Sequence, residues 1–425
     1  MTKSNRLLWI ASLIFFVFLP PALAVEEIPQ ALHQVLEEAQ TRMEAGDYRE
    51  AARLLDDFQE NQKFQHYLLD FIRGNAYLGL GQVSRAKGLY LAAIQKKPDF
   101  SPAHQNLARC YFESGDMTLA ASSFESAYTL SGGKEPDLLF YAASCLSSAD
   151  NFLGSLALFE KLMAAHKSQT KLEWKEGMAQ AMLGAGLNRK ALPLLEEIAG
   201  EATGARKRQW QEVLLYQYAE LGMGEKAIAY VHGLLDEYPS EPLWWKSLWR
   251  LHLNQGQHKE ALAALIAYSF FQPLTVEEAE LAGDLYAVSG APTKAASFYE
   301  QALANQQDPD MVLKLVDNFR RMRKPQQALE WIDKAMTQGQ EKAFTMPRAY
   351  VLYDMEEYAQ AALAFEKAAP QAREPGQAWL MAGYSAYNAQ NLTEARKFLK
   401  IAAKYKNTQQ AATRLLGQIQ PMEDS

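Results

Sequence analysis

A spaced set of small residues recurs about every 34 residues along this chain, and it constrains the fold more than any other feature. Each copy has one small residue, a second twelve positions later, and a small or apolar residue seven positions after that. The clearest copies are Gly74/Ala86/Ala93, Ala108/Ala120/Ala127, Gly283/Ala295/Ala302, Ala349/Ala361/Ala368 and Gly383/Ala395/Ala402. Self-similarity at such a period is the signature of a solenoid of stacked supersecondary units.

Weaker copies keep the same phase and bring the total to eleven, at steps of 33 to 37 residues. They are Ala39/Ala51/Phe58, Ala142/Gly154/Lys161, Ala179/Ala191/Ile198, Leu215/Ala227/Leu234, Trp249/Ala261/Tyr268 and Val316/Ala328/Ala335. Two antiparallel helices approach closely only where their side chains are small. Each copy therefore predicts a helix hairpin, with the first small residue on its first helix and the other two residues on its second helix.

Turn and aromatic residues recur in the same phase. A glycine often lies seven residues after the first small residue, where it can end the first helix in the left-handed conformation: Gly46, Gly81, Gly115, Gly186, Gly222, Gly256 and Gly290. An aromatic residue often lies four after the alanine of the second helix: Tyr90, Phe124, Tyr299 and Phe365. Larger rings at this position are expected to complete the interface between the two helices.

The repeat resembles the tetratricopeptide repeat family over roughly residues 32–409. The second copy carries Gly74-x2-Tyr77, Ala86-x3-Tyr90-x2-Ala93 and Pro98, and the seventh carries Trp245-x2-Leu248, Ala261 and Pro273. The resemblance implies an all-α solenoid of about eleven helix hairpins, wound as a right-handed superhelix with a concave groove lined by the first helices. A solenoid needs a cap over its exposed end, and a helical pattern with a polar face follows the last repeat.

We predict four segments: a signal peptide at 1–24, an N-terminal repeat array at 25–205, a C-terminal array at 206–409, and a capping helix and tail at 410–425. The two longest steps between repeats lie between residues 142 and 215. Within this range, Gly200–Gly204 is the stretch most like a linker. These features place the division between the two arrays near residues 200–210.

The first 24 residues have the three-part layout of a secretory signal. Lys3 and Arg6 precede an uncharged run from Leu7 to Leu19, and Ala22-Leu23-Ala24 follows two prolines as a cleavage site. Thirteen helical residues span about 20 Å, less than the ~30 Å core of a bilayer. We therefore expect cleavage before Val25. An uncleaved signal that anchors the chain to a membrane is the alternative.

Composition excludes several classes of protein. With 43 basic and 50 acidic residues, the net charge is −7, which disfavours a nucleic-acid-binding surface. Two cysteines in 425 residues exclude a disulfide scaffold. Cys110 and Cys145 lie on the first helices of adjacent repeats, and the sequence leaves open whether they form a disulfide or are separate buried thiols. We predict no catalytic residues, no cofactor, no metal site and no small-molecule substrate.

The last two repeats offer a candidate binding surface. Family geometry places residues one, four and five after the first small residue on the groove side. Tyr350 and Tyr384 occupy the first of these positions, and Tyr353 and Tyr387 the second. Arg320 and Arg321, one repeat earlier, are expected to add positive charge for an acidic segment. The alternative is that the C-terminal helix covers the four tyrosines as ordinary core.

The groove used by related proteins to hold a C-terminal carboxylate requires paired lysines and asparagines at fixed positions. Asn75 and Asn106 are present, but Phe71 stands where a lysine is needed, so we predict no such clamp.

These features predict an exported repeat scaffold that binds a protein or an extended peptide in its groove, as part of a cell-envelope assembly. The compartment is the periplasm if the host is a Gram-negative bacterium. The layout resembles accessory proteins of TonB-type energy-transducing systems and of exopolysaccharide export systems. A membrane-anchored assembly platform is the alternative if the signal is retained.

Overall fold

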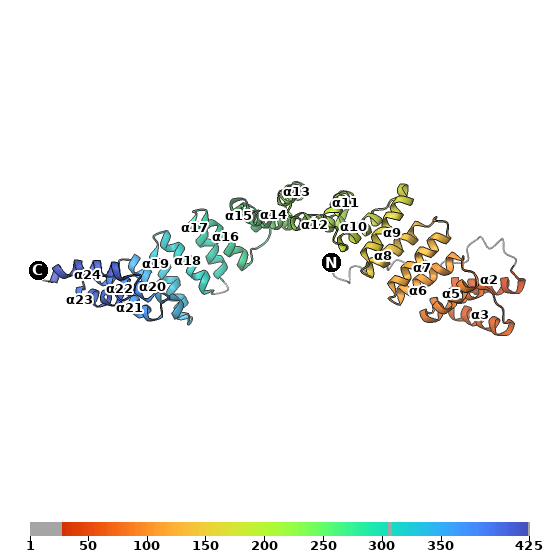
Figure 1. Ribbon diagram of the computed structural model, residues 1–425, viewed down its shortest axis with the longest axis horizontal. Helices are drawn as coiled ribbons and strands as arrows, with labels where there is room; N and C mark the ends of the chain where they lie inside the picture. The colour runs from red at the N-terminus through yellow and green to blue at the C-terminus, as the bar shows by residue number, and fades with distance from the viewer. Residues whose placement is uncertain (1–27, 305–307, 424–425) are drawn as a thin grey trace. The chain divides into compact units, whose positions relative to one another are not determined.

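The computed structural model describes residues 28–304 and 308–423 of the 425-residue chain. The predicted signal peptide, 1–24, lies outside these residues. The described residues form 23 α-helices and two short 3-10 helices, Lys167–Gln169 and Ala369–Gln371, with no strand among them. Successive helices run back and forth as antiparallel pairs (Figure 1). The predicted all-α solenoid of helix hairpins is confirmed.

The chain divides into two compact units after Gly222. The first unit contains α2 (Gln30–Glu44), α3 (Tyr48–Gln62), α4 (Tyr67–Gly79), α5 (Val83–Lys96), α6 (Ser101–Glu113), α7 (Met117–Leu130), α8 (Pro136–Ser148), α9 (Phe152–Ala165), α10 (Leu172–Gly184), α11 (Asn188–Glu201) and α12 (Gly204–Glu220). Within it, α11 packs on α12, and Ala202 between them is buried. The division between compact units therefore lies later in the chain than the predicted boundary after residue 205.

The second unit begins at Met223. It contains α13 (Gly224–Glu237), α14 (Pro242–Asn254), α15 (His258–Ser269), α16 (Val276–Val288), α17 (Pro292–Leu303), α18 (Pro309–Arg321), α19 (Pro325–Thr337), α20 (Glu341–Asp354), α21 (Tyr358–Ala368), α22 (Pro375–Asn388), α23 (Leu392–Ala402) and α24 (Gln409–Glu423). From α2 to α23 the helices match the eleven predicted pairs in order. The helices of the sixth pair, α12 and α13, belong to different units.

The second small residue of each repeat is a core residue. All ten alanines at this position are buried, with exposed fractions of 1% or less: Ala51, Ala86, Ala120, Ala191, Ala227, Ala261, Ala295, Ala328, Ala361 and Ala395. Each is the fourth residue of its helix. The period read from the sequence therefore places these ten residues correctly.

The fourth repeat is shifted by one residue from its predicted register. Ser155, not Gly154, is the fourth residue of α9, and its side chain is fully buried. Its hydroxyl donates to the carbonyl oxygen of Ala143, 2.8 Å away. The predicted third residue, Lys161, is exposed, whereas Leu162 is buried. The correct trio is therefore Ala143/Ser155/Leu162. Glycine is the smaller residue, but serine fits this position because its hydroxyl forms a hydrogen bond inside the hairpin.

The first small residue makes room for the large side chain four positions after the alanine. A Cβ atom built on Gly74 would lie 2.6 Å from Cε1 of Tyr90, and one on Gly283 would lie 2.5 Å from Cε1 of Tyr299. In the last repeat, a Cβ on Gly383 would lie 2.6 Å from Leu399. These separations are shorter than any van der Waals contact. Glycine is thus required because a bulky side chain of the second helix rests on the backbone of the first.

Helix α24 packs against α22 and α23 at the end of the array. Ala412, Leu415 and Ile419 are buried in the same core as the last two repeats. Gln410 and Arg414 lie on its exposed side. One apolar and one polar face are what a helix needs to separate the last hairpin from water.

The two cysteines are free and fully buried. Cys110 belongs to the core formed by α2 to α6, and Cys145 belongs to a different core that spans α6 to α10. Burial raises the pKa of each thiol to about 12. The structure therefore supports two separate buried thiols.

Over the described residues, no helix combines the length and apolar character that a membrane span requires.

A pair of glycine substitutions tests the close approach in the second repeat. Gly74→Ala gains helix propensity but drives a methyl group into Tyr90, which is fully buried and has no room to move. Gly88→Ala, on the partner helix α5, gains the same propensity of about 1 kcal/mol and meets nothing within 4 Å. We expect urea unfolding to show Gly74→Ala less stable than Gly88→Ala by about 1–3 kcal/mol. Equal stability of the two variants would contradict the packing described.

The state of the cysteines is tested by thiol titration without reductant. The thiolate is the reactive form, so buried thiols with a pKa of about 12 should react slowly with a thiol reagent in the native protein. After denaturation, two groups should react at once. A denatured, unreduced chain with no reactive thiol would instead establish a disulfide between Cys110 and Cys145.

Candidate protein-binding face

Side chains of successive first helices are joined by polar contacts, which hold neighbouring repeats in register. In the second unit, Lys246 of α14 pairs with Glu278 of α16 at 2.8 Å. In the first unit, Lys171, the residue directly before α10, pairs with Asp137 of α8 at 2.8 Å. Partners of this kind lie about one repeat apart in the sequence, because equivalent positions of adjacent hairpins are neighbours in space.

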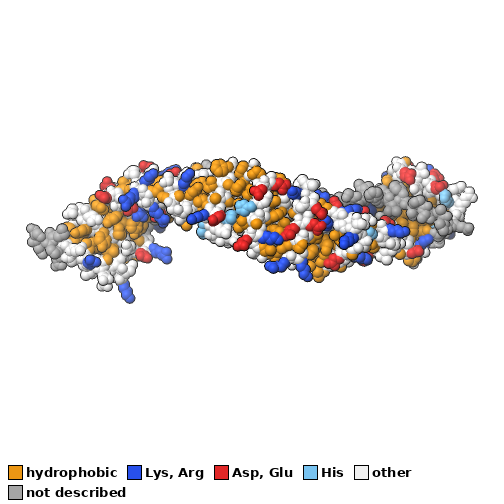
Figure 2. Space-filling view, turned by 90° about the horizontal axis from the view of Figure 1, so that it is seen from above, with side chains coloured by type: hydrophobic (Ala, Val, Ile, Leu, Met, Phe, Trp, Pro, Cys, Tyr) orange, Lys and Arg blue, Asp and Glu red, His pale blue; other side chains and the backbone are white. Residues whose placement is uncertain are grey.

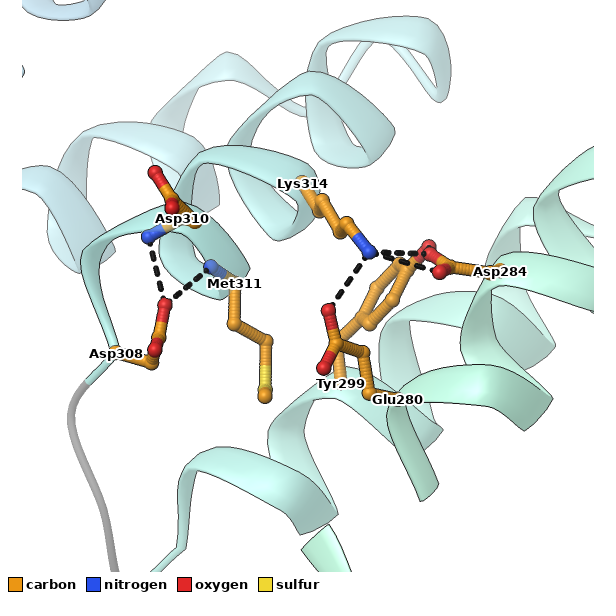
Figure 3. Close-up of polar contacts among 7 residues, drawn as sticks. All are labelled: Glu280, Asp284, Tyr299, Asp308, Asp310, Met311 and Lys314. Atoms are coloured by element: carbon orange, nitrogen blue, oxygen red, sulfur yellow. Dashed lines mark hydrogen bonds and ion pairs between the residues drawn. The ribbon is translucent and has the colours of Figure 1, made fainter. Parts of the chain in front are cut away.

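The contact between α16 and α18 is shown in Figure 3. The Lys314 ammonium lies 2.7 Å from Glu280 Oε1 and 2.7 Å from Asp284 Oδ2. The Tyr299 hydroxyl donates to Asp284 Oδ1, 2.7 Å away. Burial, followed by the hydrogen bond to this carboxylate, raises the pKa of Tyr299. These side chains are engaged with one another, so they tie the two repeats together.

The start of α18 is fixed separately. The Asp308 carboxylate accepts hydrogen bonds from the backbone N–H groups of Asp310 and Met311, at 2.8 and 3.1 Å (Figure 3). This is a normal N-terminal cap, which satisfies donors that have no partner inside the helix.

The four predicted tyrosines lie on α20 and α22 and are all half-buried. Each packs on one side against the core of the last two repeats. Tyr350 makes an edge contact with the ring of Phe365, with centroids 5.0 Å apart. Tyr353 makes a similar contact with Tyr358 at 5.4 Å. The rings are therefore less exposed than expected for a free surface patch. They are also less buried than expected for ordinary core.

A hydrogen bond links the two helices that carry these tyrosines. Asn388 of α22 donates through Nδ2 to the Tyr353 hydroxyl, 3.3 Å away. Burial raises the pKa of Tyr350, and the nearby Arg320 charge partly opposes this. A phenol hydroxyl can both donate and accept hydrogen bonds.

The two predicted arginines are already engaged within the chain. Arg320 pairs through Nε with Asp354 Oδ2 at 2.6 Å, and its guanidinium lies 5.3 Å from the centre of the Tyr350 ring. Arg321 pairs with Asp317 at 2.9 Å, one turn earlier on α18. Each of the arginines expected to add charge for an acidic segment thus already makes an ion pair within the chain. The partner of Arg320 lies 34 residues later in the sequence, which is one repeat step.

Asn75 and Asn106 are buried, so they are not presented to a carboxylate. Asn75 Oδ1 accepts hydrogen bonds from Asn106 Nδ2 and from the Tyr90 hydroxyl, both at 2.8 Å. The amide groups that would belong to a carboxylate clamp therefore serve to join α4, α5 and α6.

Charged side chains of both signs are mixed on the surface seen in Figure 2, with hydrophobic side chains between them. Among the described residues, no three His, Cys, Asp or Glu side chains gather in a way that could hold a metal ion.

Comparison with known proteins identifies the repeat. A family model described as a tetratricopeptide repeat matches residues 71–135, 247–311 and 346–412. A relative, the tetratricopeptide repeat and J domain-containing co-chaperone DNJ1 of Fusarium oxysporum f. sp. lycopersici, is 32% identical over 123 residues. The match covers 28% of this chain and 22% of the relative, so the chain spans about a fifth of that protein.

Solved structures with similar architecture include a tetratricopeptide repeat protein from Parabacteroides merdae, with 13% identity and a TM-score of 0.35. That match covers 68% of this chain and 100% of the other. Yeast Tom70 matches at 11% identity and a TM-score of 0.32, covering 93% and 96% of the two chains. The three matched segments, together with the helix hairpins and the buried small residues of each repeat, show that this chain contains tetratricopeptide repeats.

Proposed function

We propose that this chain is an exported scaffold that binds a protein or an extended peptide through the tyrosine face of its second unit. We define the tyrosine face as Tyr350, Tyr353, Tyr384 and Tyr387 with the adjoining Arg320 and Arg321. Tetratricopeptide repeat proteins bind protein partners, and scaffolds of this family are generally non-enzymatic. The observation that carries the proposal is the repetition of two half-buried tyrosines at equivalent positions of α20 and α22.

Half-burial suits these rings to binding. Contact with the core holds each ring in place, so a partner would not have to order it, and the entropic cost of association is reduced. Tyrosine also buries a large apolar area while its hydroxyl remains available for hydrogen bonds. Residues with these properties are enriched among those that dominate protein interfaces.

A double variant, Tyr353→Ala with Tyr387→Ala, tests this role. The ligand would be a peptide selected on the full-length protein from a displayed library of unstructured sequences. We expect its affinity to fall by about 2 kcal/mol or more, on the order of 30-fold, as for interface residues that dominate binding. The unfolding free energy should fall by less than the about 3–5 kcal/mol typical of a fully buried aromatic residue.

The matched control is Tyr286→Ala in the same unit. Tyr286 is also half-buried, and its ring stacks on Phe298 at 5.5 Å, but it lies outside the tyrosine face. This variant should lose some stability and retain peptide affinity. If both variants bind the peptide as tightly as the wild type, the tyrosine face is not the binding surface.

The proposed compartment is the periplasm of a Gram-negative host. Support comes from the sequence of residues 1–24, in which Lys3 and Arg6 precede a short apolar run and a small-residue cleavage motif. Within the envelope, we propose a role as an accessory protein of an assembly such as a TonB-type energy-transducing system or an exopolysaccharide export system. This part of the proposal rests on the layout of a signal followed by repeats.

N-terminal sequencing of the protein isolated from its native host tests the export step. We expect the mature chain to begin at Val25, after the Ala22-Leu23-Ala24 motif. A chain that starts at Met1 and sediments with membranes would favour the anchored platform. A chain that starts at Met1 and remains in the cytoplasmic fraction would contradict export.

A further inference from the structure

We propose that the C-terminal end of the second unit binds the anionic headgroups of a membrane surface through three unpaired lysines. We define the lysine cluster as Lys400, Lys404 and Lys406. Lys400 lies in the last turn of α23, and the other two lie in the turn between α23 and α24 (Figure 1). This proposal is independent of the tyrosine face, because it uses other residues on other helices.

Positive charge is concentrated at this end of the chain. Residues 373–419 contain seven basic and two acidic side chains, which is a net charge of +5. The whole chain contains 43 basic and 50 acidic residues, so the remainder has 36 basic and 48 acidic residues and a net charge of −12. The sign of the charge therefore reverses in the last repeat and its cap.

The charges of the lysine cluster are not neutralised by side chains of the same helix. All three lysines are exposed, and none makes an ion pair with a described residue. The one carboxylate of α23, Glu394, pairs with Lys397 at 3.0 Å, and Glu366 of α21 pairs with the same lysine at 3.2 Å. Glu394 lies in the first turn of α23, whereas the cluster begins in its last turn.

The neighbouring helices add no net negative charge. Arg373 and Glu374, which precede α22, are exposed side chains of opposite sign. Helix α22 contains no charged residue, and α24 contains Arg414 but no acidic residue from Gln409 to Ile419. The lysine cluster therefore lies in a region of net positive charge.

The turn that carries Lys404 and Lys406 is held firmly against the core. The hydroxyl of Thr408, a buried residue, donates to the carbonyl oxygen of Ala402, 2.8 Å away. A Cβ atom built on Gly376 of α22 would lie 2.7 Å from the Cβ of Tyr405, so the two backbones are in close contact. The backbone positions of the lysines are thus fixed before binding, which reduces the entropic cost of association.

The stability of α23 does not explain this concentration of charge. A cation near the C-terminal end of a helix interacts favourably with the helix dipole. Lys400 and Lys404 are four residues apart, however, and like charges at this spacing repel each other. A negatively charged partner would remove the repulsion.

The surroundings of the cluster favour a membrane surface over a protein as that partner. Among the described residues from Leu392 to Ile419, no large hydrophobic side chain is exposed. A specific protein interface is built around buried apolar and aromatic side chains. Adsorption to anionic lipids needs only basic residues close to the headgroups, and each lysine strengthens it by about fivefold.

Vesicle cosedimentation of the protein isolated from its native host tests the proposal. Vesicles of phosphatidylcholine are compared with vesicles in which about 30% of the lipid is phosphatidylglycerol, an anionic lipid. We expect stronger binding to the anionic vesicles at an ionic strength of about 0.1 M. This preference should be lost at about 1 M, because the Debye length shortens from about 10 to about 3 Å.

The triple variant Lys400→Gln, Lys404→Gln, Lys406→Gln tests the cluster itself. Its partition coefficient on anionic vesicles should fall on the order of 100-fold, or about fivefold for each lysine. Because the three side chains are exposed, the midpoint of urea unfolding should stay close to that of the wild type.

The matched control is Lys259→Gln, Lys294→Gln, Lys324→Gln. These three lysines are also exposed, and they lie in the same unit, at the starts of α15, α17 and α19. Both triple variants lose three positive charges, so they differ only in where the charges are removed. The control should bind anionic vesicles within about threefold of the wild type, because distant charges are screened.

Three results would overturn the proposal. Equal losses in the two triple variants would show an effect of net charge alone, and binding that persists at about 1 M salt would indicate insertion of an apolar segment. Binding to polyglutamate or to duplex DNA that requires the three lysines, without a preference for anionic vesicles, would assign the cluster to an acidic protein or a nucleic acid. None of these results bears on the tyrosine face, which is tested by peptide affinity.

Discussion

The structure depends on one packing contact that recurs from repeat to repeat. A small residue of the first helix lets the two helices of a hairpin approach until a bulky side chain of the second helix rests on the backbone of the first. Gly74 beneath Tyr90 and Gly283 beneath Tyr299 show it most clearly. Close packing of this kind tolerates few changes of volume. It therefore explains why small residues and rings recur in a constant phase along so much of the chain.

Polar contacts between neighbouring hairpins are built on this framework. Once each hairpin has the same geometry, equivalent positions of successive first helices face one another, and side chains about one repeat apart can pair. Lys314 with Asp284 and Arg320 with Asp354 are examples. The same rule places two pairs of tyrosines on adjacent helices. A repeated sequence thus places side chains at equivalent positions of successive hairpins. Where the residue at such a position differs between repeats, the charge or polarity of the surface differs there.

The sequence predicted the repeat register correctly wherever the second residue of the trio is alanine, and was wrong in the one repeat where a serine occupies that position. In the fourth repeat Ser155 fills the alanine position because its hydroxyl bonds to the carbonyl oxygen of Ala143. Residue size alone does not predict a serine at this position, since burial of its hydroxyl depends on a hydrogen-bond partner on the other helix. For the four tyrosines, the spacing predicted equivalent positions on α20 and α22, but not how deeply each ring is buried.

By itself, the sequence determined the all-α class, the pairing of helices and the burial of the ten alanines at the second position of the repeat, because periodic spacing is a local property of the chain. Only the tertiary structure determined which side chains pair with each other and how deeply each one is buried. It showed that Arg320 is already paired with Asp354, that Asn75 and Asn106 are buried, and that the four tyrosines are partly buried. Each of these depends on distances between side chains of different helices. Such distances follow only from the way the hairpins stack.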